Sequence, residues 1–222
     1  SLLVATIISL TQLVSGHSSA DGVAVNQPAK LAAMEGHYDK SSAADLYLFG
    51  WVDDESQKVT GLGIPGGLSF LVHQDFEEPI QGLNAFPKDE IPTQVNAVFQ
   101  FYHIMISIGM FLIGLTLYAS YLWWRGKLFD KKWLLKIFAF SVLLPQIANQ
   151  VGWFAAEMGR QPWVVYGHLK TSDAFSQEVS SNQILFSLIL FLVVYAILFL
   201  LFLYSLNKKI KHGPYNEAEN PD

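Results

Sequence analysis

Residues 152–163 read Gly-Trp-Phe-Ala-Ala-Glu-Met-Gly-Arg-Gln-Pro-Trp, so the carboxylate of Glu157 comes near the end of a strongly apolar stretch and Arg160 follows three residues later. Ionisable side chains at membrane depth are costly and mark functional sites. At about 100° per residue, one stripe about 100° wide on a helix holds these side chains: Gln146, Asn149, Gln150, Trp153, Glu157 and Arg160. A lipid-facing surface would not carry such a stripe, so we expect it to face protein, water or a cofactor.

Met105 and His103 lie close together inside a second long apolar stretch. A lone methionine in an apolar helix is usually core packing, so its position alone does not indicate a ligand. The two side chains are two residues apart, which is about 200° around a helix. They therefore cannot bind one metal from the same side, and for His103 a structural role is favoured over ligation.

Three stretches long enough to cross a membrane must position these groups, because a helical span needs about 20 apolar residues. They cover Ala97–Trp124, which has no Asp, Glu, Lys or Arg, then Trp133–Met158 and Asn182–Leu206. Lipid offers no partner to open backbone groups, so all three are predicted to be helices. The predicted fold class is an all-α integral membrane protein, a transmembrane helix bundle with an extracytoplasmic loop.

The opening stretch Ser1–Val14 is apolar but short, and it has neither an initiator Met nor the basic segment of a signal peptide. We therefore expect residues 1–15 to be the end of a truncated transmembrane helix, and the chain to be the C-terminal part of a larger protein. The expected regions are that helix end, an extracytoplasmic loop over 16–96, a transmembrane region of three helices over 97–206 and a cytoplasmic tail over 207–222.

Lys and Arg next to the spans predict the orientation, because short cytoplasmic loops are enriched in them. Residues 125–132 carry four and residues 207–212 carry three, so both segments are expected in the cytoplasm. The loop 16–96 and the link 159–181 then lie outside. The net charge of −5 argues against nucleic acid as a partner, and the absence of cysteine excludes iron–sulfur clusters and disulfides from this chain.

The loop 16–96 is too long for a simple connector. It begins with a polar part rich in turn residues (16–26), continues with a short helical candidate (28–38) and ends in a stretch interrupted by Gly and Pro. An ordered cap over the helix ends is favoured, and a solvated loop is the alternative.

Gly-Arg-Gln-Pro-Trp after Gly-Trp-Phe-Ala-Ala-Glu resembles the signature near the C-terminus of subunit I of cytochrome bd-type quinol oxidases. Three further stretches agree with that family, in the right order. Residues 30–35 resemble the start of its quinol-binding loop, 101–109 its heme-ligating helix and 131–136 the cytoplasmic edge of the next span.

The resemblance implies that Glu157 is the axial ligand of the high-spin heme b and that Met105 is a ligand of the low-spin heme b. A carboxylate suits a high-spin iron, and a thioether favours the reduced iron. Without the family, Glu157 could equally be an interfacial carboxylate paired with Arg160, which could also bind a heme propionate. Trp153 is either a residue beside the porphyrin or part of an aromatic belt. The family often has arginine where His103 stands, so His103 could lie beside a heme propionate, take part in proton movement or only form hydrogen bonds within the bundle.

Lys30 and Glu35 match family residues implicated in quinol oxidation. They are about 140° apart on a regular helix, so they do not form a stacked ion pair, and they could approach a quinol head group from two sides. In that arrangement the lysine donates to an oxygen and the glutamate accepts a proton. The alternative is a solvated amphipathic helix.

The implied function is that of a terminal oxidase of the bacterial cell membrane, which oxidises ubiquinol or menaquinol outside and reduces dioxygen to water. It generates proton motive force without pumping. The implied cofactors are a low-spin heme b, a high-spin heme b and heme d. The implied partners are the lipid bilayer, the upstream part of subunit I and a second oxidase subunit, with a small single-span subunit as a further candidate. A heme-free transporter or non-catalytic membrane subunit, and a diheme electron-transfer subunit, are the alternatives.

Overall fold

The computed structural model describes residues 1–176 and 178–212, in two parts that divide between Ala174 and Phe175. Within the described residues, four helical stretches are long and apolar enough to cross a membrane: α1 (Leu2–Asn26), α4 (Val95–Trp124), the stretch Lys132–Gly159 and the last helix, α7 (Ser181–His212). The predicted class, a helical integral membrane protein, is confirmed.

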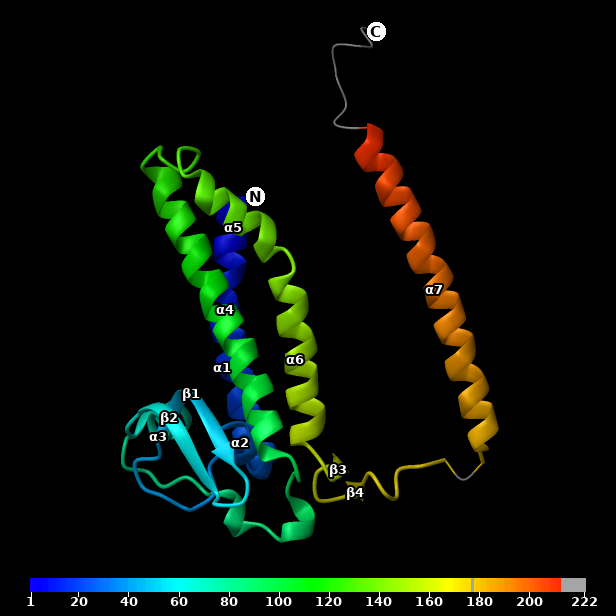
Figure 1. Ribbon diagram of the computed structural model, residues 1–222. Helices are drawn as coiled ribbons and strands as arrows, with labels where there is room; N and C mark the ends of the chain where they lie inside the picture. The colour runs from blue at the N-terminus through cyan, green and yellow to red at the C-terminus, as the bar shows by residue number, and fades with distance from the viewer. Residues whose placement is uncertain (177, 213–222) are drawn as a thin grey trace, which may run out of the picture. The chain divides into compact units, whose positions relative to one another are not determined.

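In the first part, α1 and α6 (Leu144–Gly159) each pack along α4 (Figure 1). A polar contact joins α1 to α4, because the hydroxyl of Thr6 lies 2.8 Å from that of Ser120 and donates to the Thr116 carbonyl oxygen at 3.3 Å. Small hydroxyl side chains are common at helix contacts in membranes, because they let the two backbones approach closely and can form hydrogen bonds between the helices.

Helix α1 continues to Asn26, so the interpretation of residues 16–26 as a turn-rich start of the loop was wrong. The polar side chains there bond within the helix: Ser19 donates to the Ser15 carbonyl and Asn26 to that of Gly22. Glycine weakens a helix but does not stop it, whereas proline does. The chain leaves α1 only at Gln27, directly before Pro28 opens the next helix.

The predicted span 133–158 is present but interrupted. It consists of α5 (Lys132–Ser141) and α6, with a break at Val142 and Leu143. Pro145 lies in the first turn of α6 and has no N–H to donate to the Ser141 carbonyl, which ends the hydrogen-bond ladder there.

The loop between α1 and α4 is ordered and contains a β-hairpin, which the sequence analysis did not predict. Its elements are α2 (Pro28–Met34), β1 (Leu46–Asp53), β2 (Lys58–Ile64), α3 (Gly67–His73) and two short 3₁₀ helices, η1 (Leu83–Ala85) and η2 (Lys88–Glu90). A second small hairpin, β3 (Trp163–Val165) and β4 (Leu169–Lys170), follows α6. Both hairpins lie at the same end of the first part (Figure 1).

Helix α2 is docked by its buried Ala32, Ala33 and Met34 against Val98 and Phe99 of α4. It ends in a Schellman-type turn, in which Gly36 has a φ of +62° and the His37 N–H donates to the Ala32 carbonyl at 2.8 Å. A Cβ at Gly36 would lie 2.8 Å from a methyl group of each of two hairpin valines. Only glycine therefore lets the chain turn here, and this turn fixes the residues at both ends of α2.

Helix α7 is the one helix among the described residues of the second part, which begins at Phe175. Its central residues are apolar on every side, and its last turns carry Lys208, Lys209 and Lys211. A helix that is hydrophobic all round is typical of a membrane span. The prediction of a third span after residue 181 is confirmed.

Candidate functional site

Glu157 and Arg160 form an ion pair at the end of α6, where Arg160 is the C-cap residue. Arg160 donates two hydrogen bonds, at 2.5 and 3.0 Å, to the same oxygen, Oε2 of Glu157, and a third to the Val164 carbonyl at 3.3 Å. Both side chains are partly buried. The other carboxylate oxygen, Oε1, receives no hydrogen bond from the described residues, so it keeps its full capacity as an acceptor or ligand.

Met105 lies on the side of α4 that faces α6. A Cβ added to Gly152 would lie only 2.5 Å from the Met105 sulfur, so the thioether occupies space that any other residue at 152 would fill. Gly152 and Glu157 are both on α6, five residues apart. The structure thus places the thioether at the α4–α6 contact and the carboxylate further along α6.

The polar stripe of α6 is largely uncovered by the rest of the first part. Gln146, Asn149 and Gln150 are exposed, and 56% of the Trp153 surface is accessible, with its ring against Phe154 at 5.3 Å. Side chains of this kind are not expected to face lipid. The stripe is therefore available to a cofactor or to another protein segment.

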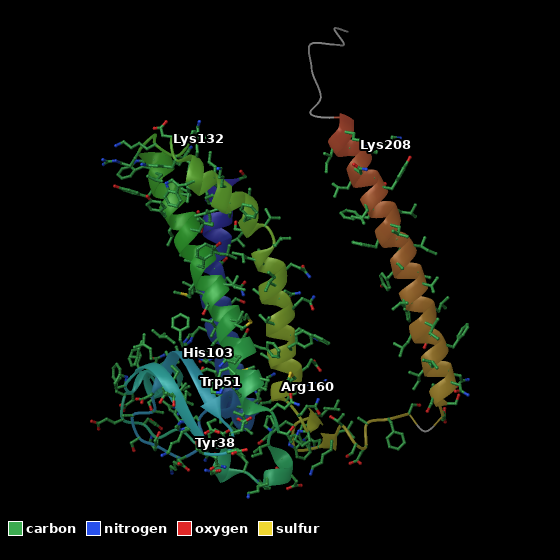
Figure 2. The ribbon with its side chains drawn as sticks, in the orientation of Figure 1. Tyr38, Trp51, His103, Lys132, Arg160 and Lys208 are labelled. Carbon is green, nitrogen blue, oxygen red and sulfur yellow. The ribbon has the colours of Figure 1, made fainter. Side chains whose placement is uncertain are left out.

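His103 is buried and connects α4 to the hairpin (Figure 2). Its ring stacks on Phe99 at 3.8 Å, Nδ1 lies 2.8 Å from the Phe99 carbonyl oxygen, and Nε2 lies 2.8 Å from that of Tyr47 in β1. Both nitrogens are thus at hydrogen-bond distance from a backbone oxygen. This arrangement favours the structural role over ligation.

Lys30 packs against the end of α6. A Cβ at Gly159 would be 3.3 Å from the Lys30 Cγ, and Lys30 lies close enough to Arg160 and Glu157 to feel both charges. Burial and the neighbouring Arg160 lower the pKa of Lys30, whereas Glu157 acts to raise it. Lys30 therefore belongs to the Glu157–Arg160 end of the site.

Glu35 follows α2 and is 2% exposed, beside Tyr102 of α4. Burial raises the pKa of Glu35 to about 8, against the opposing hydrogen bond from Tyr102. Its Oε2 is buried and has no hydrogen-bond partner among the described residues. A carboxyl group in this state is mostly protonated at pH 7, and it titrates in the range where proton transfer is most useful.

Lys30 and Glu35 line different cavities. Lys30 borders a small cavity at the end of α6, and Glu35 borders a larger one of about 370 Å³ beneath the β1–β2 hairpin, with His37, Asp39 and Asp45. Neither cavity is lined by both residues. The expectation that they approach one head group from two sides therefore has no support in a shared cavity.

Tyr102 is a residue that the sequence analysis missed. Its signal was a phenol directly before His103, two turns from the start of α4. Trp163 was also left without a role, although it closes the Gly-Arg-Gln-Pro-Trp motif.

The fold and the site define a class of protein first: an integral membrane protein with a thioether and a carboxylate on adjacent helices under an ordered loop. The family model for cytochrome bd terminal oxidase subunit I matches residues 1–214, and the chain belongs to that family. The predicted family is confirmed.

Individual relatives agree with this assignment. The chain is 32% identical over 210 residues to the cytochrome bd ubiquinol oxidase subunit 1 of Bacillus subtilis (strain 168), a match over 90% of this chain and 45% of that protein. It is 27% identical to the cytochrome bd-II ubiquinol oxidase subunit 1 of Escherichia coli (strain K12), over 94% of this chain and 53% of that protein. The bd oxidase structure from Geobacillus thermodenitrificans aligns with a TM-score of 0.76 and 32% identity, over 94% of this chain and 48% of that chain. This chain spans about half the length of these relatives.

Proposed function

We propose that this chain is part of a respiratory terminal oxidase that oxidises ubiquinol or menaquinol at the outer membrane face and reduces dioxygen to water, building proton motive force without pumping. The observation that carries the proposal is the family match over residues 1–214, together with the partly buried Glu157–Arg160 pair in the family's signature. In this proposal the chain acts with the upstream part of subunit I and with a second subunit; a small single-span subunit is a further candidate.

The residues present fit hemes of the family type. Met105 would hold the low-spin heme b and Glu157 the high-spin heme b, while heme d would depend on residues upstream. When bound, these groups carry electrons and reduce dioxygen. Gly152 leaves room for the Met105 sulfur, and Arg160 bonds only one oxygen of Glu157, which leaves Oε1 for iron. Arg160 balances the carboxylate charge at the same time. Trp153, exposed one turn before Glu157, is proposed to pack on a porphyrin edge, and His103 to support α4 two residues from Met105.

Glu35 is proposed to take the proton that quinol releases. Because burial raises its pKa to about 8, the carboxyl must first lose its own proton at pH 7, which costs only about 1.4 kcal/mol, and it can then take and return the quinol proton. The polar cavity lined by Glu35, His37, Asp39 and Asp45 offers the proton a route to the outside. Lys30, at the end of α6, is proposed to donate to a quinol oxygen.

The proposed arrangement keeps the predicted orientation. The loop between α1 and α4 lies outside and binds quinol, and residues 97–206 form the heme-binding region. Helix α1 is the end of an earlier span, and residues 207–222 are a cytoplasmic tail. The basic residues at 125–132, between α4 and α5, and those at the end of α7 support this orientation through the positive-inside rule.

The test uses the intact, purified oxidase and reduced-minus-oxidised spectra. Met105→Leu is expected to abolish the low-spin b signal while quinol still binds, and Met110→Leu, on an exposed site of the same helix, is the matched control. Glu157→Ala is expected to perturb the high-spin signals and oxygen reduction. Normal spectra and turnover in both variants would overturn the ligand assignment, and a pigment-free complex would overturn the function.

A further inference from the structure

A small cavity lies where the start of α2, the end of α6 and the β3–β4 hairpin meet. Its lining includes Gln27, Lys30, Glu90, Arg160, Trp163 and Tyr166. Its volume is about 10 Å³, which is room for one oxygen atom. The cavity can therefore hold only one terminal atom of a larger ligand.

Two residues of this lining each carry a buried polar atom that has no hydrogen-bond partner among the described residues. These atoms are Oε1 of Gln27, which can only accept, and Nε1 of Trp163, which can only donate. Leaving such atoms without a partner is unfavourable, so native structures pair nearly all of them. An atom that satisfies both must accept one hydrogen bond and donate another, as a hydroxyl group does.

The charges around the cavity nearly cancel. Lys30 and Arg160 are cations, but Arg160 is paired with Glu157 and Glu90 also lines the cavity. An anion would therefore gain no net attraction, and an anion without a hydrogen could not donate to Gln27. Both facts favour a neutral hydroxyl.

The indole that provides the donor is held in place. Lys170 lies 5.3 Å from the centre of the Trp163 ring and is itself fixed by Asp89 at 2.8 Å, while Tyr166 contacts the ring edge-on at 5.9 Å. A fixed donor loses little entropy when it binds a ligand. The N–H group is thus set in position before any ligand arrives.

We propose that this cavity binds one ring hydroxyl of quinol, which accepts a hydrogen bond from Trp163 and donates one to Gln27. The proposal rests on the quinol oxidation proposed above. It adds a consequence for the product: a quinone oxygen has no hydrogen, so it cannot donate to Gln27, whose buried oxygen then loses its partner. The site therefore binds quinol more tightly than quinone, which favours release of the product.

The experiment measures steady-state kinetics of the intact oxidase with decylubiquinol and with menadiol. Trp163→Phe removes the N–H and keeps an aromatic ring, and Gln27→Leu removes the acceptor. Each is expected to raise KM about tenfold with kcat unchanged, since one hydrogen bond to the bound hydroxyl is lost. The double variant is expected to raise KM by less than the product of the two single effects, because both residues hold the same oxygen. Trp124→Phe, at an exposed tryptophan, is the matched control.

Product inhibition gives a second readout. Gln27→Leu is expected to weaken quinol binding more than quinone binding, so the ratio of the quinone inhibition constant to KM falls. Because this measurement uses only Gln27→Leu, it still tests the proposal if the Trp163→Phe complex does not assemble. The heme spectrum and the yield of complex would show such a failure.

Three results separate the possibilities. KM unchanged in both variants, with a lowered unfolding temperature, would mean that the cavity holds only a structural water, and it would overturn this inference while quinol oxidation stands. KM effects that multiply without coupling would show that the two residues do not share an oxygen, and would also overturn it. A wild-type complex that does not oxidise quinol would instead overturn the proposed function.

Discussion

Replacing Glu35 by glutamine is expected to change how the stability of the protein depends on pH. Burial raises the pKa of this carboxyl from 4.5 to about 8. Below pH 4.5 it is protonated in both the folded and the unfolded chain. Between pH 4.5 and pH 8 the unfolded chain loses this proton and the folded chain keeps it, so stability falls as pH rises. Above pH 8 both states are ionised and the loss is complete.

The size of the effect follows from the same pKa values. At about 1.36 kcal/mol per pH unit, the change from 4.5 to about 8 corresponds to about 5 kcal/mol of folding free energy lost across this range. Glutamine has nearly the same shape and carries no charge at any pH, so this contribution disappears in Glu35→Gln. The variant should therefore gain stability relative to the wild type as the pH is raised from 5 to 8.

The assay is the unfolding temperature of the intact oxidase at a series of pH values from 5 to 9. The variant minus wild-type difference should increase by several degrees up to about pH 8 and then stay level. Glu55→Gln, at an exposed carboxyl of the hairpin turn, should give a flat difference. Parallel curves for Glu35→Gln and the wild type would show that Glu35 is ionised throughout, and would refute the reasoning from its burial.

Three further substitutions test the geometry of the site. Gly152→Ala should displace the Met105 sulfur and perturb the low-spin heme b spectrum in an assembled complex, whereas Gly109→Ala, with nothing within 4 Å of its added Cβ, should leave the spectrum unchanged. Gly36→Ala should lower the unfolding free energy by about 1–3 kcal/mol, because its φ is positive and the added Cβ meets two valines; denaturant unfolding measures this. Tyr38→Phe should cost about 1–2 kcal/mol in the same assay, because it loses a hydrogen bond of 2.9 Å to a carboxylate.

The membrane spans could be predicted because lipid imposes a simple requirement on length and apolarity. Where local backbone chemistry determines the ends of a helix, the prediction was less complete. Pro145 was visible in the sequence, and its missing N–H explains the break before α6. The extension of α1 to Asn26 was missed because serine and asparagine were taken as turn residues, although their side chains bond back to the helix.

The β1–β2 hairpin was missed although its signal is present. Residues 46–53 are rich in aromatic and branched side chains, and Asp53 accepts hydrogen bonds from the Glu55 N–H and the Ser56 hydroxyl, which closes the turn. Segments punctuated by glycine were taken as irregular. Gly61 instead lies in the sheet, opposite Gly50. The position needs glycine, because a Cβ there would be 2.1 Å from the Phe49 carbonyl oxygen.

For the site, spacing along one helix predicted what lies within one helix and no more. The separation of three residues allowed the Glu157–Arg160 pair, which the structure contains. The angle between Lys30 and Glu35 correctly excluded a stacked pair. It could not show which neighbours each would meet, because that depends on how α2 docks.

The docking of α2 explains how one short helix places Lys30 and Glu35 at two separate sites. It packs on both α4 and α6, and two glycines allow the close approach: Gly159 leaves room for the stem of Lys30, and Gly36 turns the chain directly after Glu35. The cation is thereby held at the end of α6 and the proton acceptor beside α4, at a separation set by the backbone. Since neither residue depends on the other for its position, Lys30→Met and Glu35→Gln should change quinol kinetics additively. A strong coupling between them would show that the position of one depends on the other, and it would contradict the separate positions seen here.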